Sequence, residues 1–390
     1  MSLFYQTDWL AYPSFNFLLV LLTTVLGIQL YFILTYFWRI GLHKHQPLTH
    51  QLPPVTVVVC AHNELENLHK LLPMLNEQDY PKYEVIVMND RSWDGTEEFA
   101  KTEAKVFDKV RFIHIENEYD HVTPKKYAIT TAIRQAKYDV ILLTDADCRP
   151  LTDQWIKGMA ACLTDDKDIV LGFSPYLRLS GLLNLLIRFE TFYTAVQYLS
   201  MALGGKPYMG VGRNLMYRKN TFLKNKGFYT HLKVVGGDDD LLMNEIATAT
   251  NTAVCLDPDT FMESYPKTSW SQWLKQKRRH LSVSKYYQKS NKIRLGLLSS
   301  SHFLFWVLGI TLAVLAILKL PLTWGYLYVV GGMIAIRGIV QWVVLGKATQ
   351  KLYRQVRWYV IPLGDVLWPI YYFWMGSMMW IKRKKKIRWR

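Results

Sequence analysis

The sequence predicts an α/β fold of the Rossmann-like kind, with a mainly parallel sheet flanked by transmembrane helices. In the polar middle of the 390-residue chain, short β-branched runs alternate with amphipathic stretches, which is typical of parallel strands joined by right-handed crossovers. On either side lie apolar stretches of about the 20 residues needed to span a bilayer core. We therefore expect an N-terminal transmembrane helix at 1–45, a globular domain with interfacial helices at 46–295, and a C-terminal transmembrane region with a basic tail at 296–390.

The N-terminal apolar stretch predicts a membrane anchor. No charged side chain occurs between residues 9 and 38, and Arg39, His43 and Lys44 follow directly. A secretory signal peptide fits poorly, because the stretch is long and no small-residue cleavage site follows it. Positive charge accumulates on the cytoplasmic side of membranes, so we expect an integral protein of the bacterial inner membrane whose globular domain is cytoplasmic.

The C-terminal region contains an apparent conflict of topology. Four crossings would place the tail at 382–390, with its seven basic residues, outside the cell. The last apolar stretch is interrupted by Gly364, Asp365 and Pro369, so it is either a span or a re-entrant segment, and the re-entrant form would keep the tail inside. Arg337 and Asp365 are expected to form a buried pair. The three apolar stretches lie at 303–320, 322–345 and 358–381.

The charge distribution favours a membrane surface over nucleic acid. The net charge is +16, but the basic segment 269–294 is interleaved with Trp and Tyr and directly precedes an apolar stretch. We expect membrane lipids as partners and no nucleic acid. The stretch 179–203, with Arg188 and Glu190 inside it, is either an interfacial helix or a buried one. The four cysteines form no Cys-x-x-Cys pair and imply neither a zinc site nor a disulfide framework.

The polar ends of the predicted strands are expected to meet at one edge of the sheet. The carboxylates there are Glu64, Asp90, Asp94, Asp145 and Asp147. Two aspartates one residue apart on a bend can both offer oxygen to a hard cation such as Mg²⁺ or Mn²⁺, which would bridge to a phosphate, and Lys125 could supply a further cation for a diphosphate. No glycine-rich phosphate loop is present, which argues against dinucleotide-binding and P-loop proteins. The expected strands are 55–60, 83–88, 110–115 and 140–144, and the expected helices are 65–78, 97–104 and 125–137.

Three ordered motifs resemble the nucleotide-sugar half of the membrane-bound family 2 glycosyltransferases. They are Ala-His-Asn-Glu at 61–64, Asn-Asp-Arg-Ser-Trp-Asp-Gly-Thr at 89–96 and Thr-Asp-Ala-Asp at 144–147. The resemblance spans residues 53–290 and implies a GT-A fold related to ceramide glucosyltransferase-like enzymes and processive polysaccharide synthases. It implies a nucleotide-sugar donor, in particular a UDP-sugar, with Asp90 on the base, Asp94 near the ribose or diphosphate, Asp147 on the metal and Asp145 near the sugar or metal. Other donor-binding residues implied are Ala61, Asn63, Glu64, Lys125, Gln276 and Arg279.

The second half of the chain extends the resemblance to the acceptor side. The segment 210–218 is similar to the family's Gly-x-Gly-x-Asn segment, which implies that Gly212 and Asn214 line the acceptor site. Asp238 and Asp239 stand where the family carries the Glu-Asp general base; either could serve, and the spacing favours Asp238. Residues 276–280 resemble the family's Gln-x-x-Arg-Trp signature, with His280 in place of tryptophan.

Together these features predict an inverting, metal-dependent glycosyltransferase that acts on a lipid or lipid-linked hydroxyl at the membrane. A processive polysaccharide synthase of the same family is the nearest alternative, with a glycan acceptor. A nucleotide-binding membrane scaffold or transport subunit without activity is an alternative from another class. The acidic and basic motif residues present here favour an enzyme.

Overall fold

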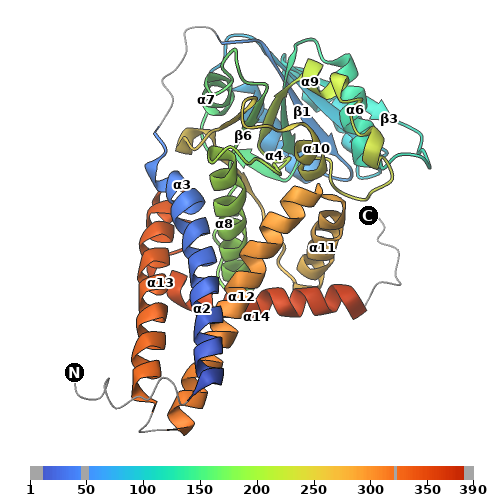
Figure 1. Cartoon of the computed structure of the whole chain (residues 1–390). Coiled ribbons are helices and arrows are strands. Elements are labelled where there is room, and N and C mark those ends of the chain that lie inside the picture. The colour runs from blue at the N-terminus through green and yellow to red at the C-terminus, as the bar shows by residue number, and fades with distance from the viewer. Residues whose placement is uncertain (1–11, 45–51, 320–322, 382–390) are drawn as a thin grey trace. The chain divides into compact units, whose positions relative to one another are not determined.

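The computed structural model describes residues 12–44, 52–319 and 323–381, which form two compact units (Figure 1). The sheet unit comprises residues 42–44, 52–288 and 351–355. The helical unit comprises residues 12–41, 289–319, 323–350 and 356–381. The expected basic tail at 382–390 lies outside the described residues.

The sheet unit is built on a seven-stranded sheet of order β3-β2-β1-β4-β7-β6-β8. Its first four strands are parallel, which confirms the predicted mainly parallel sheet. The antiparallel strand β7, which pairs with both β4 and β6, was not predicted. The strands are β1 (Val55–Ala61), β2 (Tyr83–Asp90), β3 (Val110–Ile115), β4 (Val140–Asp145), β6 (Ile169–Leu171), β7 (Leu215–Arg218) and β8 (Thr252–Val254). A separate two-stranded sheet pairs β5 (Cys148–Pro150) with β9 (Met262–Ser264).

The helices of the sheet unit follow the predicted alternation in its first half. The predicted helices correspond to α4 (Leu65–Asn76), α5 (Thr96–Lys101) and α6 (Pro124–Gln135). The helix expected at 97–104 is shorter, because the chain tightens into a 3₁₀ turn at Glu103–Val106. The remaining helices are α7 (Trp155–Ala161), α8 (Leu182–Leu203), α9 (Lys219–Lys224), α10 (Asp240–Ile246) and α11 (Trp270–Val283).

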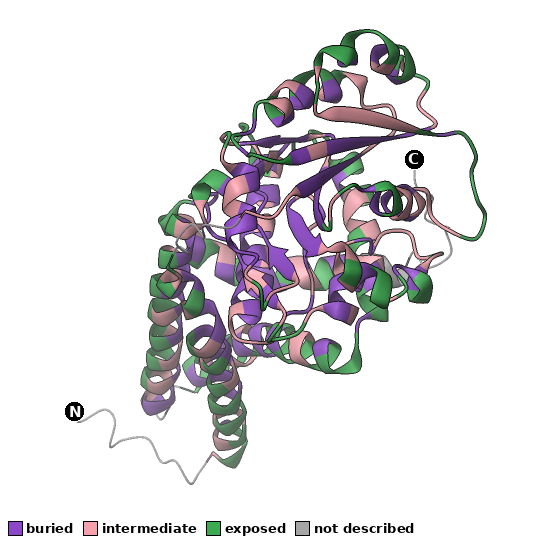
Figure 2. Ribbon diagram, turned by 90° about the horizontal axis from the view of Figure 1, so that it is seen from above, coloured by how far each residue is buried: buried purple, intermediate pink, exposed green. Residues whose placement is uncertain are grey.

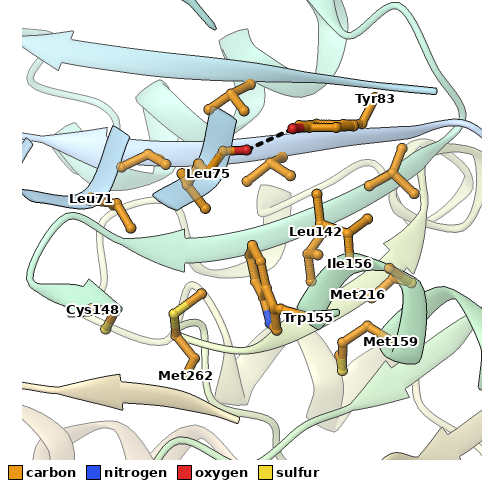
Figure 3. Packing of buried hydrophobic residues seen from close by; sticks show 14 of the residues in the cluster. Leu71, Leu75, Tyr83, Leu142, Cys148, Trp155, Ile156, Met159, Met216 and Met262 are labelled. Atoms are coloured by element: carbon orange, nitrogen blue, oxygen red, sulfur yellow. Dashed lines mark hydrogen bonds between the residues drawn. The ribbon is translucent and has the colours of Figure 1, made fainter. Parts of the chain in front are cut away.

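The core of the sheet unit is closed by helices packed against the central strands (Figure 3). Leu71 and Leu75 of α4, Leu142 of β4 and Trp155 of α7 belong to one buried cluster. The inner strands read as continuous apolar runs because both faces of a parallel sheet are covered. Figure 2 shows these strands as buried almost throughout. A rigid parallel sheet therefore fixes the positions of the loops that follow its strands.

Helix α8 corresponds to the stretch at 179–203 for which two alternatives were open. Most of its residues are buried, including Arg188 and Glu190, and Tyr198 donates to the carbonyl of Gly172 at 2.7 Å. Glu190 also pairs with Lys277 of α11 at 2.6 Å. The structure thus favours the buried helix over the interfacial one, because the charges that interrupt the apolar pattern have partners inside the protein.

The helical unit consists of α2 (Pro13–Phe32), a π-helical turn (Ile33–Phe37), α3 (Trp38–Leu42), α12 (Lys289–Leu318), α13 (Trp324–Lys351) and α14 (Ile361–Ile381). Within the described residues, three helices are long and apolar enough to cross a membrane, namely 13–42, 289–318 and 324–351. The proposed re-entrant turn at 358–381 is wrong for the part of the chain described. Residues 361–381 form one helix that continues through Pro369 without reversing, and it runs across the direction of α13 (Figure 1).

The expected buried pair between Arg337 and Asp365 is confirmed. Both guanidinium nitrogens of Arg337 donate to the carboxylate of Asp365, at 2.5 and 3.1 Å, and Arg337 also donates to Gln29 at 2.9 Å. His302 and Gln341 contact the same carboxylate at 2.8 and 2.5 Å. This buried network joins α2, α12, α13 and α14, and it accounts for an aspartate early in an apolar helix.

Candidate active site

The register of the central strands brings the motif loops to one edge of the sheet. Cys60 of β1 lies opposite Asp145 of β4, and Ala61 lies opposite Asn89 of β2. The Cys60 thiol is buried beneath this edge, and its burial raises its pKa to about 12. Lys125, Asp145, Asp238 and Asp90 all lie within electrostatic range of that thiol. The structure thus brings Asp90 and Asp145, two of the five carboxylates expected at this edge, near Lys125 and Asp238.

The first two motif loops are bonded to each other. The backbone N–H of Asn63 donates to the Ser92 hydroxyl, and the Asn63 side chain accepts from the N–H of Trp93, both at 2.9 Å. Asn63 has a positive φ of 57°, which asparagine tolerates better than most residues. The His62 ring bonds the carbonyl of Asp90. Asn63 therefore holds the shape of the loop pair, and Ala61 is buried at the end of β1.

Asp90 and Asp94 have different surroundings in this loop pair. Asp90 is buried and paired with Arg91 at 2.8 Å, and Arg91 also reaches Glu118. Asp94 accepts from the N–H of Leu65 at 2.8 Å and from the N–H and hydroxyl of Thr96, at the starts of α4 and α5. Partial burial acts to raise the pKa of Asp94, but these hydrogen bonds outweigh it and lower the pKa. The expected roles of both residues in nucleotide binding stay predictions.

Asp145, Asp147 and Glu64 form an acidic group beyond the end of β4. Burial, together with the charge of Asp145, raises the pKa of Asp147. Burial also raises the pKa of Glu64, which accepts from Asn67 at 2.6 Å and feels the charge of Asp147. Like charges held together in this way favour a cation between them. Within the described residues, no three His, Cys, Asp or Glu side chains converge as a complete metal site.

Lys125 links the acidic pair to the predicted general base. Its ammonium group lies 2.8 Å from Asp145 and 3.0 Å from Asp238. Burial acts to lower the pKa of Lys125, but the two carboxylates outweigh it and raise the pKa well above its usual value. One cation at the start of α6 thus joins two carboxylates that lie 93 positions apart in the sequence.

The three consecutive aspartates before α10 have three different environments. Asp239 accepts from the N–H of Gly212 at 2.7 Å and from the N–H of Asp240 at 2.8 Å, so both of its oxygens are used in capping and loop support. Burial and the charge of Asp238 raise the pKa of Asp239. Asp240 accepts from the hydroxyl of Tyr287 at 2.9 Å, and burial with the charge of Asp239 raises its pKa to about 8.

Asp238 differs from its neighbours because its net pKa shift is downward. Burial acts to raise the pKa of Asp238, but the charge of Lys125, the hydrogen bond from it and the charge of Arg279 outweigh that effect. The carboxylate is therefore ionised at neutral pH, which a proton acceptor requires. Gly236 and Gly237, which precede Asp238, have positive φ angles of 87° and 76°. Glycine adopts such backbone conformations without steric cost, so the turn that leads into Asp238 favours glycine at both positions.

Helix α11 brings the Gln-x-x-Arg segment next to the loop that carries Asp238. An added Cβ at Gly236 would lie 3.7 Å from Cγ of Arg279, so the arginine packs directly over the loop that carries Asp238. His280 is exposed to solvent on this helix, and crowding by nearby protein atoms, together with the charges of Lys277 and Arg279, lowers its pKa well below the usual value. His280 is thus neutral at physiological pH. Gln276 is half-buried on the same helix.

Asn214 and Gly212, expected on the acceptor side, support the site from within the protein. The Asn214 side chain is fully buried, accepts from Trp155 at 3.0 Å and donates to the carbonyls of Phe173 and Thr260 at 2.8 Å. Both polar atoms of the Asn214 amide are hydrogen bonded inside the core, so Asn214 could act on an acceptor only by positioning other residues. Gly212 contributes its N–H to Asp239.

Two further residues of the site were not singled out in the sequence. Arg213 stacks on Tyr176 with 4.4 Å between its guanidinium carbon and the ring centre, and its charge acts on Asp147. Lys126 donates to the carbonyls of His231 and Val234 at 2.6 and 2.7 Å, and burial lowers its pKa to about 8. Arg213 could have been identified from its position beside the Gly-x-Gly motif. Nothing in the sequence distinguishes Lys126 from Lys125 before it.

Comparison with known proteins identifies the domain. Residues 56–222 match the family described as glycosyl transferase family 2. The chain is 34% identical over 129 residues to glycosyltransferase AglE of Haloferax volcanii, which is 32% of this chain and 40% of that protein. It is 30% identical over 120 residues to the poly-beta-1,6-N-acetyl-D-glucosamine synthase of Staphylococcus aureus strain COL, which is 30% of this chain and 28% of that protein.

A solved structure is similar to this chain over most of its length. The mannosyltransferase PcManGT from Pyrobaculum calidifontis, solved in complex with GDP-Man and Mn²⁺, aligns with a TM-score of 0.55 and 20% identity. The alignment covers 87% of this chain and 99% of that one, and at this identity it establishes the shared fold. The ordered motifs and the mainly parallel sheet agree with this match, so residues 56–222 form a region similar to the family 2 glycosyltransferases, and the fold is of the GT-A type.

Proposed function

We propose that this protein transfers a sugar from a nucleotide-sugar, most simply a UDP-sugar, to a hydroxyl of a lipid or lipid-linked acceptor at the membrane. The observation that carries the proposal is the bridge from Lys125 to Asp145 and Asp238. Lys125 thus connects Asp145, one of the two carboxylates expected to bind the donor, with Asp238, the carboxylate expected to act on the acceptor. One cleft then contains the groups needed for both substrates.

The acidic pair fits a divalent cation on the donor side. Asp147 is half-buried with a raised pKa, and its carboxylate accepts from the Cys148 thiol at 3.6 Å. Asp147, with Asp145, would hold Mg²⁺ or Mn²⁺, whose charge would stabilise the diphosphate as it leaves. The bound GDP-Man and Mn²⁺ of PcManGT support a nucleotide-sugar and a metal for a fold of this kind. The diphosphate would complete the coordination that the protein side chains leave open.

Asp238 is the proposed general base. Its carboxylate takes the proton of the acceptor hydroxyl while that oxygen bonds to the anomeric carbon and the bond to the nucleoside diphosphate breaks. The electron pair of the broken bond leaves with the diphosphate, near the positive charges of Arg279 and Lys125. A single displacement with one base inverts the configuration at the anomeric carbon, which is why we propose an inverting enzyme.

The acceptor is proposed to be membrane-bound because the three candidate spans leave the sheet unit tied to the bilayer at several points of the chain. The match to a poly-beta-1,6-N-acetyl-D-glucosamine synthase supports a second candidate, a processive synthase that extends a glycan. The two differ in the length of their product. One added sugar per acceptor supports the first, and a ladder of products supports the second.

Purified full-length protein should be screened for transfer and hydrolysis of UDP- and GDP-sugars with Mg²⁺ and with Mn²⁺. We expect Asp238→Asn to remove nearly all transfer while nucleotide binding persists, and Asp147→Asn to weaken metal-dependent nucleotide binding. Asp166→Asn, which alters an exposed carboxylate paired only with its sequence neighbours Lys167 and Thr164, is the matched control. Undiminished transfer by Asp238→Asn would exclude the assigned base. Absence of transfer by the wild type with every donor would favour a scaffold.

A further inference from the structure

A groove runs along the helical unit between α2 and α12. Its volume is about 660 Å³, and Gly27, Ile28 and Phe32 of α2 and Ile293 and Leu297 of α12 form its apolar wall. An added Cβ at Gly27 would meet no atom within 4 Å, so the absence of a side chain there leaves open space.

One end of the groove is polar. Of the described residues that line it, Arg294 alone is charged, and its side chain donates to Asn291 at 2.9 Å. No carboxylate among the described residues lies within ion-pair distance of Arg294. The rings of Tyr31 and Tyr36 lie at the same end with 6.0 Å between their centres, and Arg294 lies within electrostatic range of Tyr36. A cation and two phenols therefore converge where the apolar wall ends.

The backbone of α2 changes at the same place. Residues 33–37 form a π-helical turn although none of them is proline or glycine. Such turns inside α-helices occur frequently at functional sites because they redirect side chains. Here the turn contains Tyr36, which lines the polar end. The π-helical turn therefore lies in the part of the helix that faces Arg294.

The dimensions suit one leaflet of a membrane. Thr24 and Tyr36 line the two ends of the groove on α2, and at about 1.5 Å per residue they lie about 18 Å apart. Half of a bilayer core is about 15 Å thick. The polar end lies at the basic start of α12 and just before Arg39 of α3, where the positive-inside rule expects the cytoplasmic headgroups.

We propose that this groove binds one anionic phospholipid of the cytoplasmic leaflet, with an acyl chain along the apolar wall and the phosphate and its charged headgroup on Arg294, Tyr31 and Tyr36. Arg294 supplies the charge complementarity that a zwitterionic lipid would satisfy less well. The groove belongs to the helical unit and the proposed sugar-transfer residues belong to the sheet unit, and occupancy of the groove does not depend on the proposed activity.

Native mass spectrometry of the full-length protein, with phosphatidylglycerol and phosphatidylcholine added in turn, tests the proposal. We expect phosphatidylglycerol to bind about fivefold more tightly, the preference worth one arginine near a headgroup. Arg294→Gln should abolish the preference. Gly27→Leu should fill the groove and lower the affinity for both lipids, whereas Gly332→Leu, which adds the same side chain at an open position of α13, should change nothing.

Three outcomes would overturn the proposal. The first is equal binding of the two lipids by wild type and by Arg294→Gln. The second is a dimer that Gly27→Leu dissociates, which would assign the groove to a second copy of the chain. The third is a Gly27→Leu protein that keeps its phosphatidylglycerol affinity but loses transfer to a lipid acceptor, which would assign the groove to the acceptor. Because Arg294→Gln removes only charge, it reports on the headgroup even if Gly27→Leu folds poorly.

Discussion

Replacing Lys125 with methionine should move the acid limb of the pH profile of kcat/KM upward. In the wild type, Lys125 lies 3.0 Å from Asp238, whose side chain is only 12% exposed, and it is the main influence that holds the pKa of Asp238 below its usual range. A hydrogen bond to a charged group contributes roughly 1.5–3 kcal/mol. Since one pH unit corresponds to about 1.36 kcal/mol, its loss should raise the pKa of Asp238 by about 1 to 2 units.

The sign follows from the protonation states. A base with a lowered pKa stays ionised down to low pH, so wild-type activity should fall only below about pH 4, the usual range of an aspartate. Without Lys125, burial still acts to raise the pKa of Asp238 and is opposed mainly by Arg279. The variant should therefore lose its base at a higher pH than the wild type does. Lys125→Arg, which keeps the charge, should retain the wild-type acid limb.

The assay is initial-rate transfer between pH 3.5 and 8.5 at saturating metal, with donor KM measured separately because Lys125 also contacts Asp145. A uniform loss of activity at every pH, with an unmoved acid limb, would refute the reasoning that Lys125 tunes the base. A wild-type acid limb well above pH 4 would point instead to Asp239, whose pKa is raised by burial and by Asp238.

Three further changes have defined outcomes. Asp94→Ala removes hydrogen bonds at the starts of α4 and α5 and should cost about 1–2 kcal/mol per cap, read as a lower urea midpoint of the sheet unit in the full chain. Asp365→Leu leaves Arg337 buried without its counter-charge and should destabilise the protein by about 3–5 kcal/mol in thermal unfolding, whereas adding Arg337→Leu should recover most of the loss; no recovery would show that the pair is not the cause. Lys126→Met frees two carbonyls before Asp238 and should lower kcat about tenfold with little change in donor KM, with partial rescue by Lys126→Arg.

The parallel half of the sheet and its motif loops were predictable because their signals are local. Apolar β-branched runs such as 55–60 end abruptly in polar turns, and the carboxyl ends of parallel strands must meet at one edge. The Arg337–Asp365 pair was predictable for a related reason, since two isolated charges in apolar helices need each other.

Other features depend on contacts between distant residues and leave no local pattern. Strand β7 is antiparallel because of how the chain returns to β4, which the four residues Leu215–Arg218 do not encode by themselves. Asn214 looked like a site residue from its motif, but three core hydrogen bonds hold it away from solvent. Lys126 is adjacent to Lys125 in sequence, yet its partners lie more than a hundred residues away, and nothing around it in the sequence indicates them.

The segment at 351–355 has a consequence for the direction of the chain through the bilayer. Gln355 accepts from the backbone of Tyr176, and Tyr353 packs on Phe261, so the end of α13 returns to the sheet unit just as the end of α3 and the start of α12 do. With three crossings, an odd number, the N-terminal end of α2 and the start of α14 face opposite compartments. If all three candidate spans cross and α14 remains on the side of the sheet unit, the described residues after 351 share the compartment of the sheet unit.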